Sequence, residues 1–447
     1  MVGCRAGGPW VGGLVIRGGT VVAPDGIRPA DLLVAGGRIT ALLPPGDPAP
    51  GAVLDAAGCL VLPGAIDAHV HFRAPGLTHK EDWPSGSAAA VAGGVTTVLD
   101  MPNVRPATVG AEALAAKAQL VAGRSRCDYG FYGGLAAGQL GALAELAAGG
   151  VIGFKVFLGE TTAALPPPDD GELLLGLGLA ARLGLRTMVH AENGAILQWA
   201  ARTPPPPEAS ALRRHGLRRP AVAEVEAVAR ACLLAREAAA GLCIAHLSTA
   251  GGAEAVRRAK ADGADVRAEA CLHHLLLTEE EAEACGALAQ VNPPLRAPAD
   301  RAALWRAIED GTVDEVGSDH APHTAQEKAG PAPPAGFAGV QNLLPHLLGD
   351  ARLGLRRLVE LTAEGPARTW GLWPRKGRLA AGADADLALV RPAAPRGAVR
   401  QWSLHPDSPV LRCCQVRAEV VATVVGGQLA YRGGELIGAP AGHWVRP

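Results

Sequence analysis

The middle of the chain alternates short runs of apolar and β-branched residues with long stretches rich in alanine, leucine, glutamate and arginine. The short runs predict buried strands, and the stretches between them predict helices, for example over 220–240 and 251–263. The expected strands cover residues 65–72, 95–101, 127–133, 151–158, 185–191, 242–248, 265–272 and 313–320. Eight strands that alternate with helices predict an α/β fold with a (β/α)8 TIM barrel.

Both ends of the chain show a different pattern. Residues 13–62 and 375–434 hold short apolar runs separated by glycine-rich turns. We expect these two segments to pair into one small β-sandwich beside the barrel. The predicted organisation is an amino-terminal part of the sandwich over 1–62, a metal-dependent barrel over 63–374 and a carboxy-terminal part of the sandwich over 375–447. Two proline-rich pieces, 202–210 and 329–339, are predicted to be loops that follow strand ends.

Composition narrows the class of protein. The 447 residues are 49% hydrophobic and 19% charged, which is typical of a globular protein. The net charge of −1 gives no positive electrostatic field that would attract nucleic acid or acidic membranes. The nine cysteines form no CxxC pair, and Cys127, Cys243 and Cys271 lie in apolar runs where buried thiols are expected. The chain has no apolar run long enough for a membrane span and no signal-peptide pattern at its start. We therefore expect a cytoplasmic protein.

The first expected strand ends in polar side chains on one face. His69, His71 and Arg73 occupy alternate positions, so they point the same way, and Pro75-Gly76 then breaks the strand. A histidine pair of this kind also occurs as ordinary polar residues near a surface. Taken alone, it therefore leaves metal binding undecided.

Three more residues of metal-binding type follow other expected strands. His190, His246 and Asp319 each stand at the carboxyl end of an apolar run. A TIM barrel builds its active site at that end of its strands. The recurrence of this pattern predicts that the three residues and the histidine pair bind metal together.

Lys155 lies inside the almost wholly apolar run "VIGFKVFLG". One interpretation is a lysine whose stem is buried and whose amine reaches solvent. The other is a neutral amine that takes up CO2 and becomes an anionic carbamate with two oxygens. Four imidazoles, one aspartate and one carbamate form a suitable ligand set for two Zn2+ ions.

These residues resemble the amidohydrolase superfamily and, within it, the cyclic amidohydrolases: dihydroorotases, allantoinases and hydantoinases. The resemblance extends over almost the whole chain, and its motifs are the HxH pair, "GFKVFLG", "VHAEN", "AHLST" and "SDHAPH". It implies that His69, His71 and Asp319 bind the more buried metal, that His190 and His246 bind the second, and that carboxylated Lys155 and a hydroxide bridge the two ions. It further implies that Asp319 is catalytic and carries the proton of the attacking hydroxide to the leaving nitrogen.

Other residues are similar to those of dihydroorotases. Arg73 follows the HxH pair, Asn103 stands in "DMPNVRP", Asn292 in "VNPPLR" and His323 in "SDHAPHT". We expect Arg73 and Asn103 to bind the ring carboxylate of dihydroorotate through charge-assisted hydrogen bonds, and Asn292 and His323 to contact the ring amides. The predicted activity is the reversible cyclisation of N-carbamoyl-L-aspartate to L-dihydroorotate in pyrimidine biosynthesis.

Several alternatives stay open. Residues 189–252 are as similar to allantoinases and hydantoinases as to dihydroorotases, and Ala74 stands where dihydroorotases often have an acidic residue. An allantoinase or hydantoinase of the same fold is therefore the alternative. A non-catalytic dihydroorotase-like scaffold would be expected to lack metal ligands, which this chain keeps. A phosphotriesterase or deaminase on the same barrel does not explain "MPN" and "NPPLR".

The expected partners follow from these assignments. A small-molecule substrate is expected, with no nucleic acid and no membrane. The resemblance implies a homo-oligomer. It also raises a carbamoyltransferase as a protein partner, without deciding whether one exists.

Overall fold

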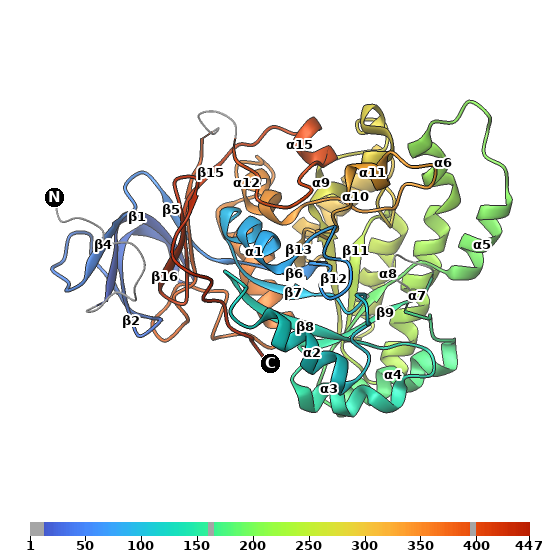
Figure 1. Cartoon of the computed structure of the whole chain (residues 1–447), viewed down its shortest axis with the longest axis horizontal. Coiled ribbons are helices and arrows are strands. Elements are labelled where there is room, and N and C mark those ends of the chain that lie inside the picture. The colour runs from blue at the N-terminus through green and yellow to red at the C-terminus, as the bar shows by residue number, and fades with distance from the viewer. Residues whose placement is uncertain (1–12, 160–164, 394–398) are drawn as a thin grey trace.

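The computed structural model describes residues 13–159, 165–393 and 399–447. Two sheets organise these residues: an eight-stranded parallel sheet from the middle of the chain and a nine-stranded sheet built from both ends. In Figure 1 the sheet of the terminal segments lies on the left, with blue and red strands side by side, and the parallel sheet with its helices lies on the right. The prediction of a barrel beside a separate β domain is confirmed. The prediction about a signal peptide falls mainly on residues 1–12, outside the described residues.

The parallel sheet forms the barrel. Its strands run in chain order and are β6 (Ala65–Val70), β7 (Val95–Asp100), β8 (Asp128–Gly134), β9 (Gly153–Phe157), β10 (Thr187–His190), β11 (Leu242–Leu247), β12 (Val266–Cys271) and β13 (Glu315–Gly317). Apart from Arg267, every residue in them is buried, as expected for parallel strands covered by helices. All eight lie within or next to the predicted ranges.

The barrel closes between its first and last strands. Val70 forms a parallel bridge with His320, and the backbone N–H of His71 donates to the carbonyl of His320 at 2.8 Å. This closure brings the end of β6 next to the end of β13. It thereby places the HxH pair beside Asp319.

Helices surround the parallel sheet in Figure 1. The longer ones are α1 (Trp83–Ala92), α2 (Ala111–Val121), α3 (Leu143–Gly149), α4 (Asp170–Arg182), α5 (Gly194–Arg202), α6 (Ala211–Arg218), α7 (Ala221–Glu237), α8 (Ala250–Ala261) and α10 (Pro298–Glu309). The shorter ones are α9 (Leu272–Leu276), α11 (Ala325–Lys328), α12 (Leu343–Leu347), α13 (Leu355–Val359), α14 (Gly365–Thr369) and α15 (Pro409–Cys413). Short 3-10 segments are η1 (Leu140–Ala142), η2 (Glu283–Ala289, kinked at Gly286) and η3 (Val340–Asn342), and η4 (Glu360–Glu364) is a π-helical turn. Helices α7 and α8 confirm the helices predicted from the sequence.

The second sheet joins both ends of the chain. Its strands are β1 (Leu14–Ala23), β2 (Gly26–Ala35), β3 (Arg38–Leu43), β4 (Ala52–Asp55), β5 (Leu60–Pro63), β14 (Leu387–Arg391), β15 (Glu419–Val425), β16 (Gln428–Arg432) and β17 (Glu435–Leu436). Strand β5 pairs antiparallel with β14, with Val61 opposite Leu389. Both residues are fully buried in a separate hydrophobic core. No helix among the described residues is long and apolar enough to cross a membrane.

Candidate metal centre

His69, His71 and Asp319 meet where β6 and β13 end. The Nε2 atoms of His69 and His71 lie 3.3 Å and 3.2 Å from the same oxygen of Asp319, Oδ1. All three side chains are buried. Two imidazoles and a carboxylate that converge in this way form a donor set for a divalent transition metal.

The other ring nitrogens of the pair are held by a residue on β12 and by a residue that follows β7. Nδ1 of His69 lies 2.8 Å from Oε1 of Glu269 on β12, and Nδ1 of His71 donates to Oδ1 of Asn103 at 2.9 Å. Because both partners accept a hydrogen bond, they keep the proton on Nδ1. The lone pair of each ring is then on Nε2, which points toward Asp319 and is available for metal.

His190 and His246 form the second half of the site. Nδ1 of His190, at the end of β10, lies 2.9 Å from Nε2 of His246 on β11. Nε2 of His190 lies 2.8 Å from Glu192, whose carboxylate also pairs with Arg219. Glu192 therefore holds a proton on the far side of the ring and leaves Nδ1 of His190 facing His246.

Lys155 on β9 is fully buried, and its Nζ atom has no hydrogen-bond partner among the described residues. Burial lowers the pKa of this amine, so a neutral form is accessible near neutral pH. An unpartnered amine buried next to four imidazoles is costly unless another group joins it. Addition of CO2 would convert it into a bidentate anion, and with that anion the donor set would fit a pair of metal ions.

Burial also lowers the pKa of all four histidines, that of His69 to about 3. The rings are therefore neutral at neutral pH, and neutral imidazole is the form that binds metal. This electrostatic state agrees with the donor set.

Backbone strain concentrates at the same place. Arg73, His246 and Asp319 have φ angles of 61°, 36° and 46°, in the left-handed region that non-glycine residues avoid. Such residues cost about 1–3 kcal/mol each and persist where surrounding structure holds them. At Asp319 the turn ends β13 earlier than the predicted strand and directs the carboxylate to the two histidines.

The predicted substrate residues lie unevenly around the site. Arg73, Asn103 and Asn292 line the same cavity as the histidines and Asp319. His323 is not among the residues that line it. Instead, its ring lies behind Arg73, with Nε2 3.2 Å from Arg73 Nη2 and Nδ1 3.1 Å from Lys80 Nζ.

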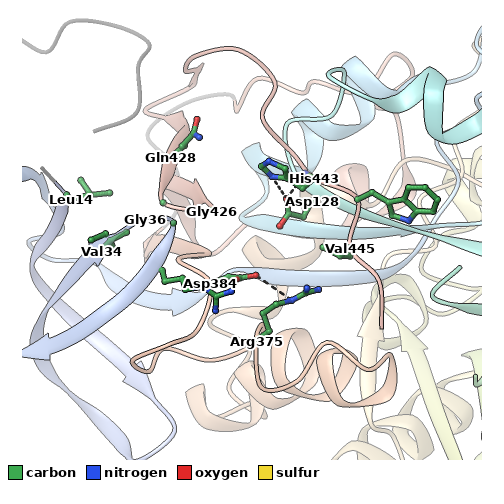
Figure 2. Close-up of a pocket in the computed structure, with 16 residues that line it drawn as sticks. Leu14, Val34, Gly36, Asp128, Arg375, Asp384, Gly426, Gln428, His443 and Val445 are labelled. Atoms are coloured by element: carbon green, nitrogen blue, oxygen red, sulfur yellow. Dashed lines mark hydrogen bonds and ion pairs between the residues drawn. The ribbon is translucent and has the colours of Figure 1, made fainter. Parts of the chain in front are cut away.

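A larger cavity, of about 570 Å3, lies at the junction of the two sheets and away from the predicted metal ligands (Figure 2). Its two acidic side chains, Asp128 and Asp384, already have partners. Asp128 accepts hydrogen bonds from Lys376 Nζ and from the backbone of His443, and Asp384 lies near Lys376 and Arg375. We therefore place the chemistry at the smaller cavity with the metal-binding residues.

Sequence reasoning missed the two carboxylates behind the histidines. Glu269 lies in the apolar run "DVRAEACL", and Glu192 follows His190 in "VHAEN". A buried charge inside a strand was the signal that singled out Lys155, and the same signal would have found Glu269.

Comparison with known proteins places the chain in a family. A model described as "Amidohydrolase family" matches residues 60–430. The allantoinase of Rubrobacter xylanophilus is 41% identical, with 97% of each chain covered, and that of Solibacter usitatus is 40% identical, with 97% of this chain and 96% of its own covered. The solved structure of L-hydantoinase (dihydropyrimidinase) from Arthrobacter aurescens superposes with a TM-score of 0.91 at 30% identity, covering 98% of this chain and all of its own.

The prediction of a dihydroorotase is wrong, because these full-length relatives are allantoinases and a hydantoinase. It rested mainly on Arg73 and Asn103 as a carboxylate clamp. The structure gives the amide oxygen of Asn103 another task, which is to hold Nδ1 of His71. The expected role in pyrimidine biosynthesis and the possible carbamoyltransferase partner both depended on the dihydroorotase prediction, so they no longer have support.

Proposed function

Because this chain belongs to the amidohydrolase family, we propose that it is a metal-dependent hydrolase that opens the ring of a cyclic ureide, and that allantoin is its substrate. The observation that supports hydrolase activity is the set of buried side chains of metal-binding type around Lys155. All four histidines and Asp319 line one cavity, and the fully buried Nζ atom of Lys155 has no hydrogen-bond partner among the described residues. The full-length similarity to allantoinases supports the substrate.

The predicted ligands divide between two ions. His69, His71 and Asp319 would hold one, His190 and His246 the other, and a carbamate on Lys155 would bridge them. Formation of the carbamate joins the Lys155 nitrogen to the carbon of CO2 and releases one proton. When bound, a pair of Zn2+ ions supplies an activated water and polarises an amide carbonyl.

The chain's own residues complete the reaction. Asp319 accepts a proton from the attacking water and returns it to the ring nitrogen as the ring C–N bond breaks. The products are a carboxylate and a ureido group that holds the transferred proton. The second proton of the water is released to solvent as the carboxylic acid ionises, so one water is consumed for each ring opened. The carboxylate of Asp319 is suited to this transfer because it is buried beside the metal-binding rings.

Two cavity residues are suited to orient the ureide. Oδ1 of Asn292 and Nε of Arg73 are buried, line the cavity region and have no hydrogen-bond partner among the described residues. The ring of allantoin presents N–H donors and carbonyl acceptors. Asn292 would accept from a ring N–H, and Arg73 would donate to a carbonyl.

A hydantoin is the second candidate substrate. Its ring is the one that allantoin carries, without the ureido substituent, and the fold is similar to that of an L-hydantoinase at a TM-score of 0.91. The two candidates differ only in the substituent that the cavity must accept. A homo-oligomeric state and a cytoplasmic location remain predictions.

The test is turnover by the purified protein of allantoin, a 5-substituted hydantoin and dihydroorotate, with metal content measured on the same sample. We expect fastest hydrolysis of allantoin with at least two zinc ions per chain. Faster turnover of the hydantoin would select the second candidate. Turnover of dihydroorotate alone, or an absence of bound metal, would contradict the proposal.

A further inference from the structure

A second group of side chains of metal-binding type lies at the end of β12 and shares no residue with the predicted catalytic ligands. Cys271, His273 and His274 are at most 3% exposed, and each offers one ligand atom within 4.8 Å of the other two. None of the three lines the catalytic cavity. The six predicted catalytic ligands include no cysteine, so the chemistry of this group is distinct.

Two nitrogens in the group lack partners. Nε2 of His273 and Nδ1 of His274 are buried and make no hydrogen bond among the described residues. The other nitrogen of His274, Nε2, donates to the carbonyl of Pro293 at 3.0 Å. That bond fixes the proton on Nε2 and leaves a lone pair on Nδ1. A buried lone pair without a donor costs free energy, which a bound cation would offset.

The geometry of the group suits one ion. The rings of His273 and His274 have their centroids 4.2 Å apart, and the Cys271 thiol makes only a long contact of 3.9 Å, with Glu269. Bonds of about 2.0–2.3 Å place two ligand atoms of a tetrahedral ion roughly 3.5 Å apart. Small side-chain rotations would therefore bring these atoms onto one ion.

We infer that Cys271, His273 and His274 form a third metal site, which takes a divalent ion of the zinc class. One sulfur and two imidazoles are a donor set for Zn2+ or Co2+ and are a poor one for Mg2+ or Ca2+. Binding breaks the S–H bond of Cys271, releases that proton to solvent and forms a metal–sulfur bond. His274 keeps its proton on Nε2.

The position of the group gives the site a structural role. Pro293 follows Asn292, which lines the catalytic cavity, and His274 is bonded to its carbonyl. The ring of His273 packs edge-on against Phe337, which follows Gly336 in the cavity wall. An ion held by both histidines would therefore stiffen the two loops that form that wall.

Cobalt substitution tests the site without relying on activity. A cobalt ion bound to a thiolate shows a charge-transfer band in the near ultraviolet, and the predicted catalytic ligands supply no thiolate. We expect the cobalt-loaded protein to show this band and to hold three ions per chain. The Cys271→Ser variant should lose the band and hold two.

The matched control is Cys413→Ser. Cys413 is exposed, and its Sγ lies 3.4 Å from that of Cys285, so this pair is another thiol group that could bind cobalt. The control should keep both the band and the third ion. Loss of the band in the control but not in Cys271→Ser, or two ions and no band in the parent protein, would overturn the inference.

A measurement on the parent protein covers the case in which Cys271→Ser fails to fold. X-ray absorption at the zinc edge of the zinc-loaded protein should show a sulfur neighbour at about 2.3 Å for one zinc in three. A first shell of nitrogen and oxygen alone would exclude the site, whatever the variants do.

Discussion

Oδ1 of Asn103 accepts a hydrogen bond from Nδ1 of His71 at 2.9 Å. The amide follows β7, and the imidazole follows β6, so this bond joins neighbouring strand ends. It fixes the ring so that Nε2 faces Asp319 at 3.2 Å. Asn103 would thus act on a metal through His71, which is why its presence in "MPN" does not by itself indicate a carboxylate substrate.

The Asn103→Ala variant should bind metal more weakly than the parent protein but bind substrate about equally well. Groups that orient metal ligands typically contribute a factor of about 10–100 in metal affinity. We therefore expect a loss of that size in zinc affinity, measured by competition with a chelator, and little change in KM when zinc is saturating. The Asn103→Asp variant, whose carboxylate also accepts from Nδ1, should keep the affinity. A raised KM with unchanged zinc affinity would instead make Asn103 a substrate contact.

The Lys155→Ala variant tests the carbamate. Removal of the amine should reduce metal content and lower kcat by at least about 100-fold, or about 3 kcal/mol of barrier. A small carboxylate such as propionate fits the vacated space and carries the same two oxygens, so it should restore part of the activity. In the parent protein, loading with 13C-bicarbonate should give a carbamate signal by NMR. Full activity of Lys155→Ala, or no effect of bicarbonate during metal loading, would contradict this role.

The fold could be predicted from the sequence because the barrel strands carry a strong local signal. Runs such as 151–158 are almost wholly apolar, and the structure shows the corresponding strands buried. The ends were less predictable. The expected strand over 313–320 is only Glu315–Gly317 in the structure, because Asp319 adopts a φ of 46°. A turn of this kind depends on tertiary contacts and leaves no mark in the local pattern.

The candidate site was partly predictable for the same reason. His69, His190 and Asp319 stand at strand ends, and barrel geometry brings such ends together. The partners of those residues could not be predicted, because Glu269 meets His69 across 200 positions of the chain. The substrate was misjudged because a residue type was taken as evidence for a contact. Only the structure shows that the amide oxygen of Asn103 bonds Nδ1 of His71 and that His323 contacts Arg73 and does not line the cavity.

Lys376 should be a determinant of stability at the junction of the two sheets. Its buried Nζ contacts the carboxylates of Asp128 at 2.5 Å, Asp386 at 2.6 Å and Asp384 at 3.2 Å. Lys376→Met would leave three carboxylates without their shared cation, and breaking a buried pair costs about 3–5 kcal/mol. We expect a fall of that size in the free energy of unfolding, measured by urea denaturation.

The neighbouring Arg375 provides the matched control. Its side chain is 42% exposed, and its Nε atom lies 3.8 Å from a carboxylate oxygen of Asp384 (Figure 2). A pair of this kind contributes about 0–1 kcal/mol. Arg375→Met should therefore unfold close to the parent protein, and both variants should keep the parent kcat where they are folded. Equal destabilisation by the two variants would show that the buried ion pairs of Lys376 contribute no more stability than the partly exposed pair of Arg375.

Lys328 should make stability depend on pH in the alkaline range. Its Nζ donates to the carbonyls of Ala287, Leu288 and Gln290, and burial lowers its pKa from 10.5 to about 7. Between these values the unfolded chain holds a proton that the folded chain has lost, so the free energy of unfolding rises with pH, by at most about 1.4 kcal/mol per pH unit. Below pH 7 both forms are protonated, and this dependence disappears. The measurement is the free energy of unfolding of the metal-loaded parent and of Lys328→Met, obtained by urea denaturation at a series of pH values. As pH rises from about 7 to 10, the parent should gain stability relative to the variant. A constant difference between the two proteins would mean that the folded amine keeps its ordinary pKa.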